Sequence, residues 1–143
     1  MKVNYPVKIT KEDGRYLVIF PDFEECATEG KTLKEALFNA AEALTLTLEG
    51  RMEEGMEIPL PKQRKAKYSI APAARVQSAL LLRLARGKRS IAEIARALGT
   101  SWPSAAKLED PRHSPTLRQL EKAASAVGQR LVVSFEDDEN RPK

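Results

Sequence analysis

A change of hydrophobic spacing along these 143 residues limits the folds that the chain can adopt. Residues 3–9 place an apolar side chain at every second position, which is typical of a strand with one buried face. From residue 73 onward the apolar side chains lie three and four positions apart, as in amphipathic helices. The two patterns are separated by Pro59 and Pro61, which lack a backbone N–H, and by the basic run 62–67. The chain is therefore predicted to be α+β and to consist of a first unit over 1–70 with a linker at about 59–67, a second unit over 73–135, and an acidic tail over 136–143.

The first unit is predicted to be a small antiparallel sheet covered by one helix. Asp13 and Gly14 supply a turn between the first two strands, which makes them a hairpin. Thr32 and Glu35 have the spacing of a capping box, so a helix is expected to begin there, and Gly50 is expected to end it. The predicted strands are, in chain order, residues 3–9, 16–20, 26–28 and 68–70.

The second unit is predicted to hold four helices. Ser90 is placed to cap the second helix, and Gly99 to end it. Pro103 is tolerated in the first turn of the third helix, because an amide there has no helical partner. The predicted helices are, in chain order, residues 73–86, residues 91–98, a short helix from Ser101, and residues 117–127.

A last strand is predicted where Leu131, Val133 and Phe135 occupy alternate positions. A single strand in a helical unit has no partner for its backbone groups. We therefore expect it to pair with the same strand of a second copy about a two-fold axis, giving a homodimer or a higher oligomer. Packing onto the helices of its own chain is the alternative. The acidic tail after this strand is expected to be disordered.

Charge is divided unevenly between the two halves. Residues 1–61 hold seven Lys and Arg against twelve Asp and Glu, a net charge of −5. Residues 62–135 hold fifteen basic against four acidic side chains, a net charge of +11. This division favours a basic partner for the first half and a polyanion such as nucleic acid for the second, although uneven solubilising charge gives the same totals.

The single cysteine and the single histidine exclude some kinds of chemistry. Cys26 cannot close an intramolecular disulfide, and Cys26 with His113 cannot complete a Cys/His zinc site. Cys26 is expected to be a small buried hydrophobic residue rather than a nucleophile. The sequence has no signal-peptide pattern and no apolar run of membrane-spanning length, so we expect a cytoplasmic protein without a membrane partner.

The run 90–109 has the pattern of a helix-turn-helix, and residues 73–135 resemble the Cro/repressor-like (Xre-type) DNA-binding module. Ala105 and Leu108 are expected to pack inward, which leaves the other side of the third helix to enter a major groove. The residues expected to contact DNA are Ser101, Trp102, Ser104, Lys107, Arg89, Arg112, His113 and Arg118. Among them, Ser104 and Lys107 are the expected base contacts. A helical interaction module without DNA binding is the alternative.

Two other details of this helix-turn-helix bear on its contacts. Trp102 and Pro103 stand where relatives often carry a base-reading glutamine, and neither side chain accepts a hydrogen bond. Trp102 therefore either wedges against DNA or serves a core or interface role. Arg89, Arg112 and Arg118 are expected to contact phosphates, and His113 either joins them or lies in a solvated loop. Two modules are expected to read an inverted repeat with half-sites about 34 to 36 Å apart, or a multiple of that distance.

Residues 3–70 resemble the HicB-type antitoxin domain. The resemblance rests on the run 16–23 (Tyr-Leu-Val-Ile-Phe-Pro-Asp-Phe), on Pro59-Leu-Pro61, and on Cys26, Thr28, Gly30, Thr32, Glu35, Ala36, Asn39, Ala40, Glu42, Ala43 and Leu44. Membership implies a partial ribonuclease-H-like fold and a basic HicA-type toxin that cleaves mRNA. It also implies neutralisation of that toxin by direct binding, and repression of the operon by the second unit.

The toxin is expected to meet Asp22, Phe23, Glu24 and Glu25, at an exposed strand end. The three acids also raise the alternative of a nuclease, whose reaction needs carboxylates converging on two divalent cations. Glu24 and Glu25 are adjacent, however, and point to opposite sides if extended, and the first strand offers no acid. We therefore expect no catalytic residue, metal or cofactor. A transcriptional repressor whose first unit senses a small ligand is the remaining alternative.

Overall fold

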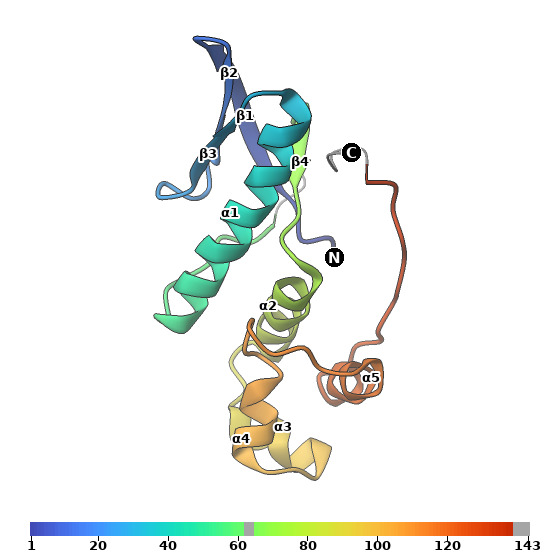
Figure 1. Ribbon diagram of the computed structural model, residues 1–143. Helices are drawn as coiled ribbons and strands as arrows, with labels where there is room; N and C mark the ends of the chain where they lie inside the picture. The colour runs from blue at the N-terminus through green and yellow to red at the C-terminus, as the bar shows by residue number, and fades with distance from the viewer. Residues whose placement is uncertain (62–64, 139–143) are drawn as a thin grey trace. The chain divides into compact units, whose positions relative to one another are not determined.

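The computed structural model describes residues 1–61 and 65–138, which form two compact units (Figure 1). The first comprises the described residues up to Ala73 together with 136–138, and the second comprises Ala74–Phe135. The first unit holds a four-stranded antiparallel sheet and one helix, and the second holds four helices, which confirms the predicted α+β class. Part of the predicted linker, 62–64, and part of the predicted acidic tail, 139–143, lie outside the described residues. Among the helices described, none is long and apolar enough to cross a membrane.

The sheet has the strand order β3-β2-β1-β4. Its strands are β1 (Tyr5–Glu12), β2 (Arg15–Ile19), β3 (Ala27–Gly30) and β4 (Tyr68–Ile70). Glu12 pairs with Arg15, so β1 and β2 are joined by the predicted two-residue turn. Asp13 and Gly14 both have positive φ, at 49° and 76°. A two-residue hairpin turn of type I′ requires this conformation at both turn positions, and aspartate and glycine are residue types that tolerate it.

Helix α1 (Leu33–Glu53) packs on one face of the sheet. Thr32 caps its first turn by accepting a hydrogen bond from the Glu35 N–H at 3.1 Å. The predicted end at Gly50 is wrong, because the helix continues to Glu53. Gly55, with φ of 68°, adopts the left-handed conformation instead, and the N–H groups of Gly55 and Met56 donate back to the last turn.

The end of β3 comes unusually close to the first turn of α1. A Cβ atom on Gly30 would lie 2.7 Å from the Ala36 Cα and closer still to the Ala36 nitrogen. Glycine is therefore required here for the approach of one backbone to another. Asn39, one turn further along α1, donates from its side-chain amide to the Glu29 carbonyl at 3.0 Å, which ties the helix to the backbone of this edge strand.

The second unit consists of α2 (Ala74–Arg86), α3 (Ile91–Leu98), α4 (Trp102–Lys107) and α5 (Leu117–Ala126). Ser90, Ser101 and Thr116 cap α3, α4 and α5 by accepting backbone N–H groups. Gly99, with φ of 66°, makes the turn between α3 and α4. The four predicted helices are confirmed, since short capping residues and left-handed glycines mark most of their ends in the sequence.

The predicted last strand does not form within this chain. Residues 131–135 belong to no strand or helix, and Val132, Val133 and Phe135 are 75%, 60% and 100% exposed. The physical reason is that a strand needs a neighbour for its ladder, and no strand of the described residues pairs with it. Packing of Phe135 onto its own helices, the alternative, does not occur either.

Candidate interaction surfaces

The loop between β2 and β3 carries the four residues expected to bind the toxin. Phe23 is fully buried, with its ring centroid 4.8 Å from that of Tyr5 in an edge-on arrangement. The Arg51 guanidinium lies 4.9 Å from the centroid of the same ring. The expectation that Phe23 is exposed is therefore wrong. Its side chain anchors the loop in the core instead of standing out toward a partner.

Glu25 is exposed but forms an ion pair with α1. Arg51 donates from Nε and Nη2 to the two Glu25 carboxylate oxygens, each at 2.7 Å. These hydrogen bonds are the main reason that the pKa of Glu25 falls to about 2. Arg51 also donates to the Glu57 carbonyl at 3.3 Å. Glu25 and Arg51 therefore close the β2–β3 loop against α1 and the segment that follows it.

Asp22 and Glu24 have different surroundings. Asp22 is half-buried and Glu24 is exposed. Burial, and secondarily the Asp22 charge, raises the pKa of Tyr5 to about 12, and the Tyr5 hydroxyl donates to the Pro59 carbonyl at 2.8 Å. Within the described part of the chain, no three His, Cys, Asp or Glu side chains gather closely enough to hold a metal ion.

Cys26 is the last residue of the β2–β3 loop and is buried. It is 2% exposed, and burial raises the pKa of its thiol. The predicted burial is confirmed, and the position suits a small apolar side chain better than a reactive one.

The outer surface of α1 holds exposed side chains that the sequence analysis did not single out. Phe38 is 39% exposed and Leu46 is 67% exposed, with the exposed Glu42 between them. Counting positions from the buried residues Ala36, Ala40 and Leu44 would have shown that Phe38, Glu42 and Leu46 fall outside the buried face. We refer to these three residues as the outer stripe.

In the second unit, α4 has one buried side and one exposed side, as predicted. Ala105 and Leu108 are 2% and 9% exposed and face the core, as predicted. The other side of this short helix is exposed and brings together the four predicted residues Ser101, Trp102, Ser104 and Lys107. The Ser101 hydroxyl already makes two hydrogen bonds at the start of α4: it accepts the Ser104 N–H and donates to the Ser104 hydroxyl at 3.0 Å.

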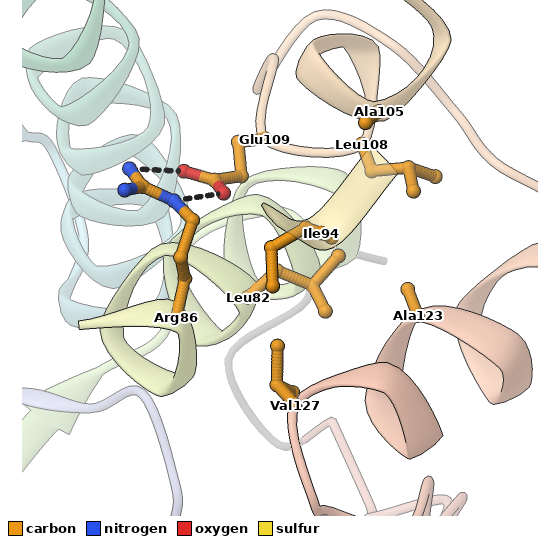
Figure 2. A pocket seen from close by; sticks show the side chains of 8 residues that line it. All are labelled: Leu82, Arg86, Ile94, Ala105, Leu108, Glu109, Ala123 and Val127. Atoms are coloured by element: carbon orange, nitrogen blue, oxygen red, sulfur yellow. Dashed lines mark hydrogen bonds and ion pairs between the residues drawn. The ribbon is translucent and has the colours of Figure 1, made fainter. Parts of the chain in front are cut away.

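Beneath α4, the helices meet around a small hollow that has room for about one water molecule (Figure 2). The side chains that line it are Leu82, Arg86, Ile94, Ala105, Leu108, Glu109, Ala123 and Val127. On one side Arg86 donates from Nε and Nη2 to Glu109 at 2.6 and 3.0 Å. This half-buried ion pair joins the end of α2 to Glu109, two residues after the end of α4, so it fixes the position of α4. The hollow itself is too small for a metabolite.

The predicted phosphate contacts occupy different environments. Arg89 donates from its guanidinium to the carbonyls of Arg86, Ala85 and Val127, so it already links the ends of α2 and α5. Arg112 is exposed and His113 half-buried in the loop after α4, where the Asp110 carboxylate accepts the Arg112 N–H. Arg118 is exposed in the first turn of α5.

Comparisons with known proteins identify the class to which these units belong. The family model described as "HicB_like antitoxin of bacterial toxin-antitoxin system" matches residues 4–71, which span the sheet and α1. "Antitoxin HicB 1" of Photorhabdus laumondii is 34% identical over 136 residues, which cover 94% of this chain and 88% of that protein. "Antitoxin HicB" of Escherichia coli K12 is 31% identical over 135 residues, covering 92% of this chain and 98% of the relative. A second Photorhabdus protein, "Antitoxin HicB 2", is 32% identical over 132 residues, covering 92% of this chain and 95% of that protein.

These matches place the chain among the antitoxins of bacterial toxin–antitoxin systems. More particularly, it belongs to the HicB-like antitoxin family. The resemblance of residues 3–70 to the HicB-type domain is thereby confirmed, and the family indicates a regulatory role with a cognate toxin as partner.

Proposed function

We propose that this protein neutralises a basic, mRNA-cleaving toxin of the HicA type through its first unit and represses its own operon through its second. The family match over residues 4–71 is the observation that carries this proposal. The matched residues lie within the Met1–Ala73 part of one compact unit, so the second unit, Ala74–Phe135, is available for another partner.

The charges of the two units support two different partners. Residues 1–61 carry a net charge of −5, and residues 74–135 carry eleven basic against four acidic side chains, a net charge of +7. A negative surface speeds encounter with a basic toxin, and a positive one speeds encounter with DNA. Both associations should therefore weaken as salt rises.

The α3–turn–α4 pair is the proposed DNA-binding element, a helix-turn-helix of the Xre type. Ser104 and Lys107 lie on the exposed side of α4, where they would reach base edges in a major groove. Arg112 and Arg118 would contact phosphates. Arg89 is better placed to hold the helix ends, because its guanidinium is engaged by three carbonyls.

Specific binding by such small modules requires two of them on an inverted repeat. The extended segment with Leu131, Val133 and Phe135 is the proposed dimer contact, in which it pairs with the same segment of a second copy. Val133 and Phe135 are exposed, Leu131 is half-buried, and no strand of the described residues pairs with the segment, as expected of a strand that completes its ladder in a partner. Deleting residues 130–143 should then weaken the dimer, as measured by light scattering.

Two measurements test the division of roles. Co-expression of residues 1–73 with the cognate toxin should relieve growth arrest as the full chain does, whereas residues 74–143 should not. A requirement for residues 74–143 in neutralisation would contradict the assignment.

Operator binding should depend on α4. Lys107→Ala is expected to cost about 1 to 3 kcal/mol and to relax sequence preference. Arg112→Ala should weaken all sequences alike and reduce the salt dependence by about one unit. Unaltered preference after the combined Ser104→Ala and Lys107→Ala changes would show that another surface reads the DNA.

A further inference from the structure

The outer stripe of α1 is an apolar surface with an acidic centre. Phe38 and Leu46 lie eight residues apart, about 12 Å along the helix axis, with Glu42 midway between them. A single exposed leucine is ordinary on a protein surface. Two large apolar side chains about two turns apart on one side of a helix, however, are close enough to enter one groove of a partner.

The other sides of α1 are already covered within the first unit. Leu44 and Leu48 are fully buried in the interface with the sheet. Asn39 binds the Glu29 carbonyl on one flank, and on the other the Thr45 hydroxyl accepts the Ala73 N–H at 2.9 Å. In the part of this unit that the structure describes, the outer stripe is the side of α1 that these contacts leave accessible.

The charge around the outer stripe is negative. Residues 33–53 contain four Glu against Lys34 and Arg51. The Arg51 charge is compensated by Glu25 at 2.7 Å, whereas Glu42 has no ion pair among the described residues. A partner for this surface should therefore combine an apolar groove with Lys or Arg side chains at its edge.

We propose that the outer stripe is where the first unit docks on its basic toxin partner, with Phe38 and Leu46 as apolar anchors and Glu42 opposite a basic side chain. This inference rests on the proposed function and replaces the β2–β3 loop as the main contact. That loop is less suited to the task, because Phe23 is buried and Glu25 is engaged by Arg51. A few well-packed residues near the centre of an interface contribute most of its binding energy.

The test measures binding of the full-length protein to the cognate toxin by isothermal titration calorimetry and surface plasmon resonance. The double variant Phe38→Ala, Leu46→Ala should weaken binding by about 100-fold or more, mainly through faster dissociation. Glu42→Lys should slow association and reduce its dependence on salt, whereas Glu42→Gln should have a smaller effect in the same direction.

Ile19→Ala is the matched control. Ile19 is 50% exposed, but its neighbour Val18 is fully buried beneath α1, so Ile19 lies on the opposite face of the sheet. Binding by this variant should stay within about threefold of the wild type. The Phe38/Leu46 variant should keep its circular dichroism and its light-scattering mass, which separates a lost contact from a lost fold.

Each alternative outcome is decisive. Toxin affinity retained by the Phe38/Leu46 variant, or lost in Ile19→Ala instead, overturns the docking surface while leaving the proposed function intact. A changed oligomer mass with unchanged toxin affinity would assign the outer stripe to contact between copies of this chain. If the wild-type protein does not bind the toxin, the proposed function fails and this inference fails with it.

Discussion

The first unit buries its core between a sheet and one 21-residue helix, whereas the second packs four helices of 6 to 13 residues against one another. In the first, segments far apart in sequence are held by a buried aromatic cluster and by side chains such as Tyr5 and Asn39 that bind distant carbonyls. The second has an apolar core of its own, and its short helices are positioned by caps at the start of α3, α4 and α5 and by the half-buried ion pair of Arg86 with Glu109.

The difference suggests that the two units tolerate different changes. The stability of the first unit should fall when an atom is added where the backbones of β3 and α1 come close together. It should change little when a surface charge is lost. The second should be sensitive to loss of a polar group that positions a short helix. The unfolding of the two units can be followed separately, because the only tryptophan, Trp102, lies in the second unit. The only tyrosines, Tyr5, Tyr16 and Tyr68, lie in the first.

The largest effect is expected from Gly30→Ala. The new Cβ would overlap the backbone of Ala36, which cannot move without shifting the first turn of α1. We expect the first unit to lose about 3 kcal/mol of stability. Tyrosine near-UV dichroism during urea titration should report this loss, while Trp102 fluorescence should show an unchanged transition for the second unit.

Gly50→Ala is the control in the same helix. A Cβ there would meet nothing within 4 Å, and Gly50 is not among the residues with positive φ. Alanine inside a helix should therefore stabilise the first unit by about 0.5 to 1 kcal/mol. Equal losses from both substitutions would mean that β3 does not approach α1 as described.

A second prediction compares the ion pairs of the two units. The Glu109 side chain is 14% exposed and that of Glu25 is 48% exposed, although each receives two hydrogen bonds from an arginine. Glu109→Gln should cost the second unit about 2 kcal/mol, because it leaves a half-buried Arg86 charge uncompensated. Glu25→Gln should cost the first unit less than about 1 kcal/mol, since water screens an exposed pair. Losses of similar size in the two urea titrations would contradict the comparison.

Local signals in the sequence predicted much of this fold. Asp13-Gly14 was sufficient for the hairpin, because two adjacent residues that tolerate positive φ favour a two-residue turn. Ser90 and Gly99 likewise marked the ends of α3. The buried side of α4 followed from the positions of Ala105 and Leu108. Each of these features depends on residues close together in the chain.

Features that depend on distant contacts were not predictable in the same way. Phe23 lies among charged residues and looks like part of an exposed loop, but its burial is decided by Tyr5 and by Arg51, 28 residues further on. Gly50 and Gly55 are both able to end a helix, and only the backbone conformation shows which one does. The segment 131–135 has the alternation of a strand, but alternation cannot supply the neighbour that a strand requires.

The smallest effect is a pH dependence confined to the first unit. The pKa of Glu25 is lowered from 4.5 to about 2, chiefly by hydrogen bonds from Arg51, so the folded state favours the ionised carboxylate. The stability that this provides is fully present above pH 4.5 and is lost as pH falls from about 4.5 toward 2. Tyrosine-monitored unfolding of Glu25→Gln should therefore show a weaker acid dependence than the wild type in this window. Glu24→Gln leaves the bonds between Glu25 and Arg51 in place and should retain the wild-type dependence. If Glu25→Gln and the wild type lose stability in parallel between pH 5 and 2, the ion pair does not hold the loop in solution.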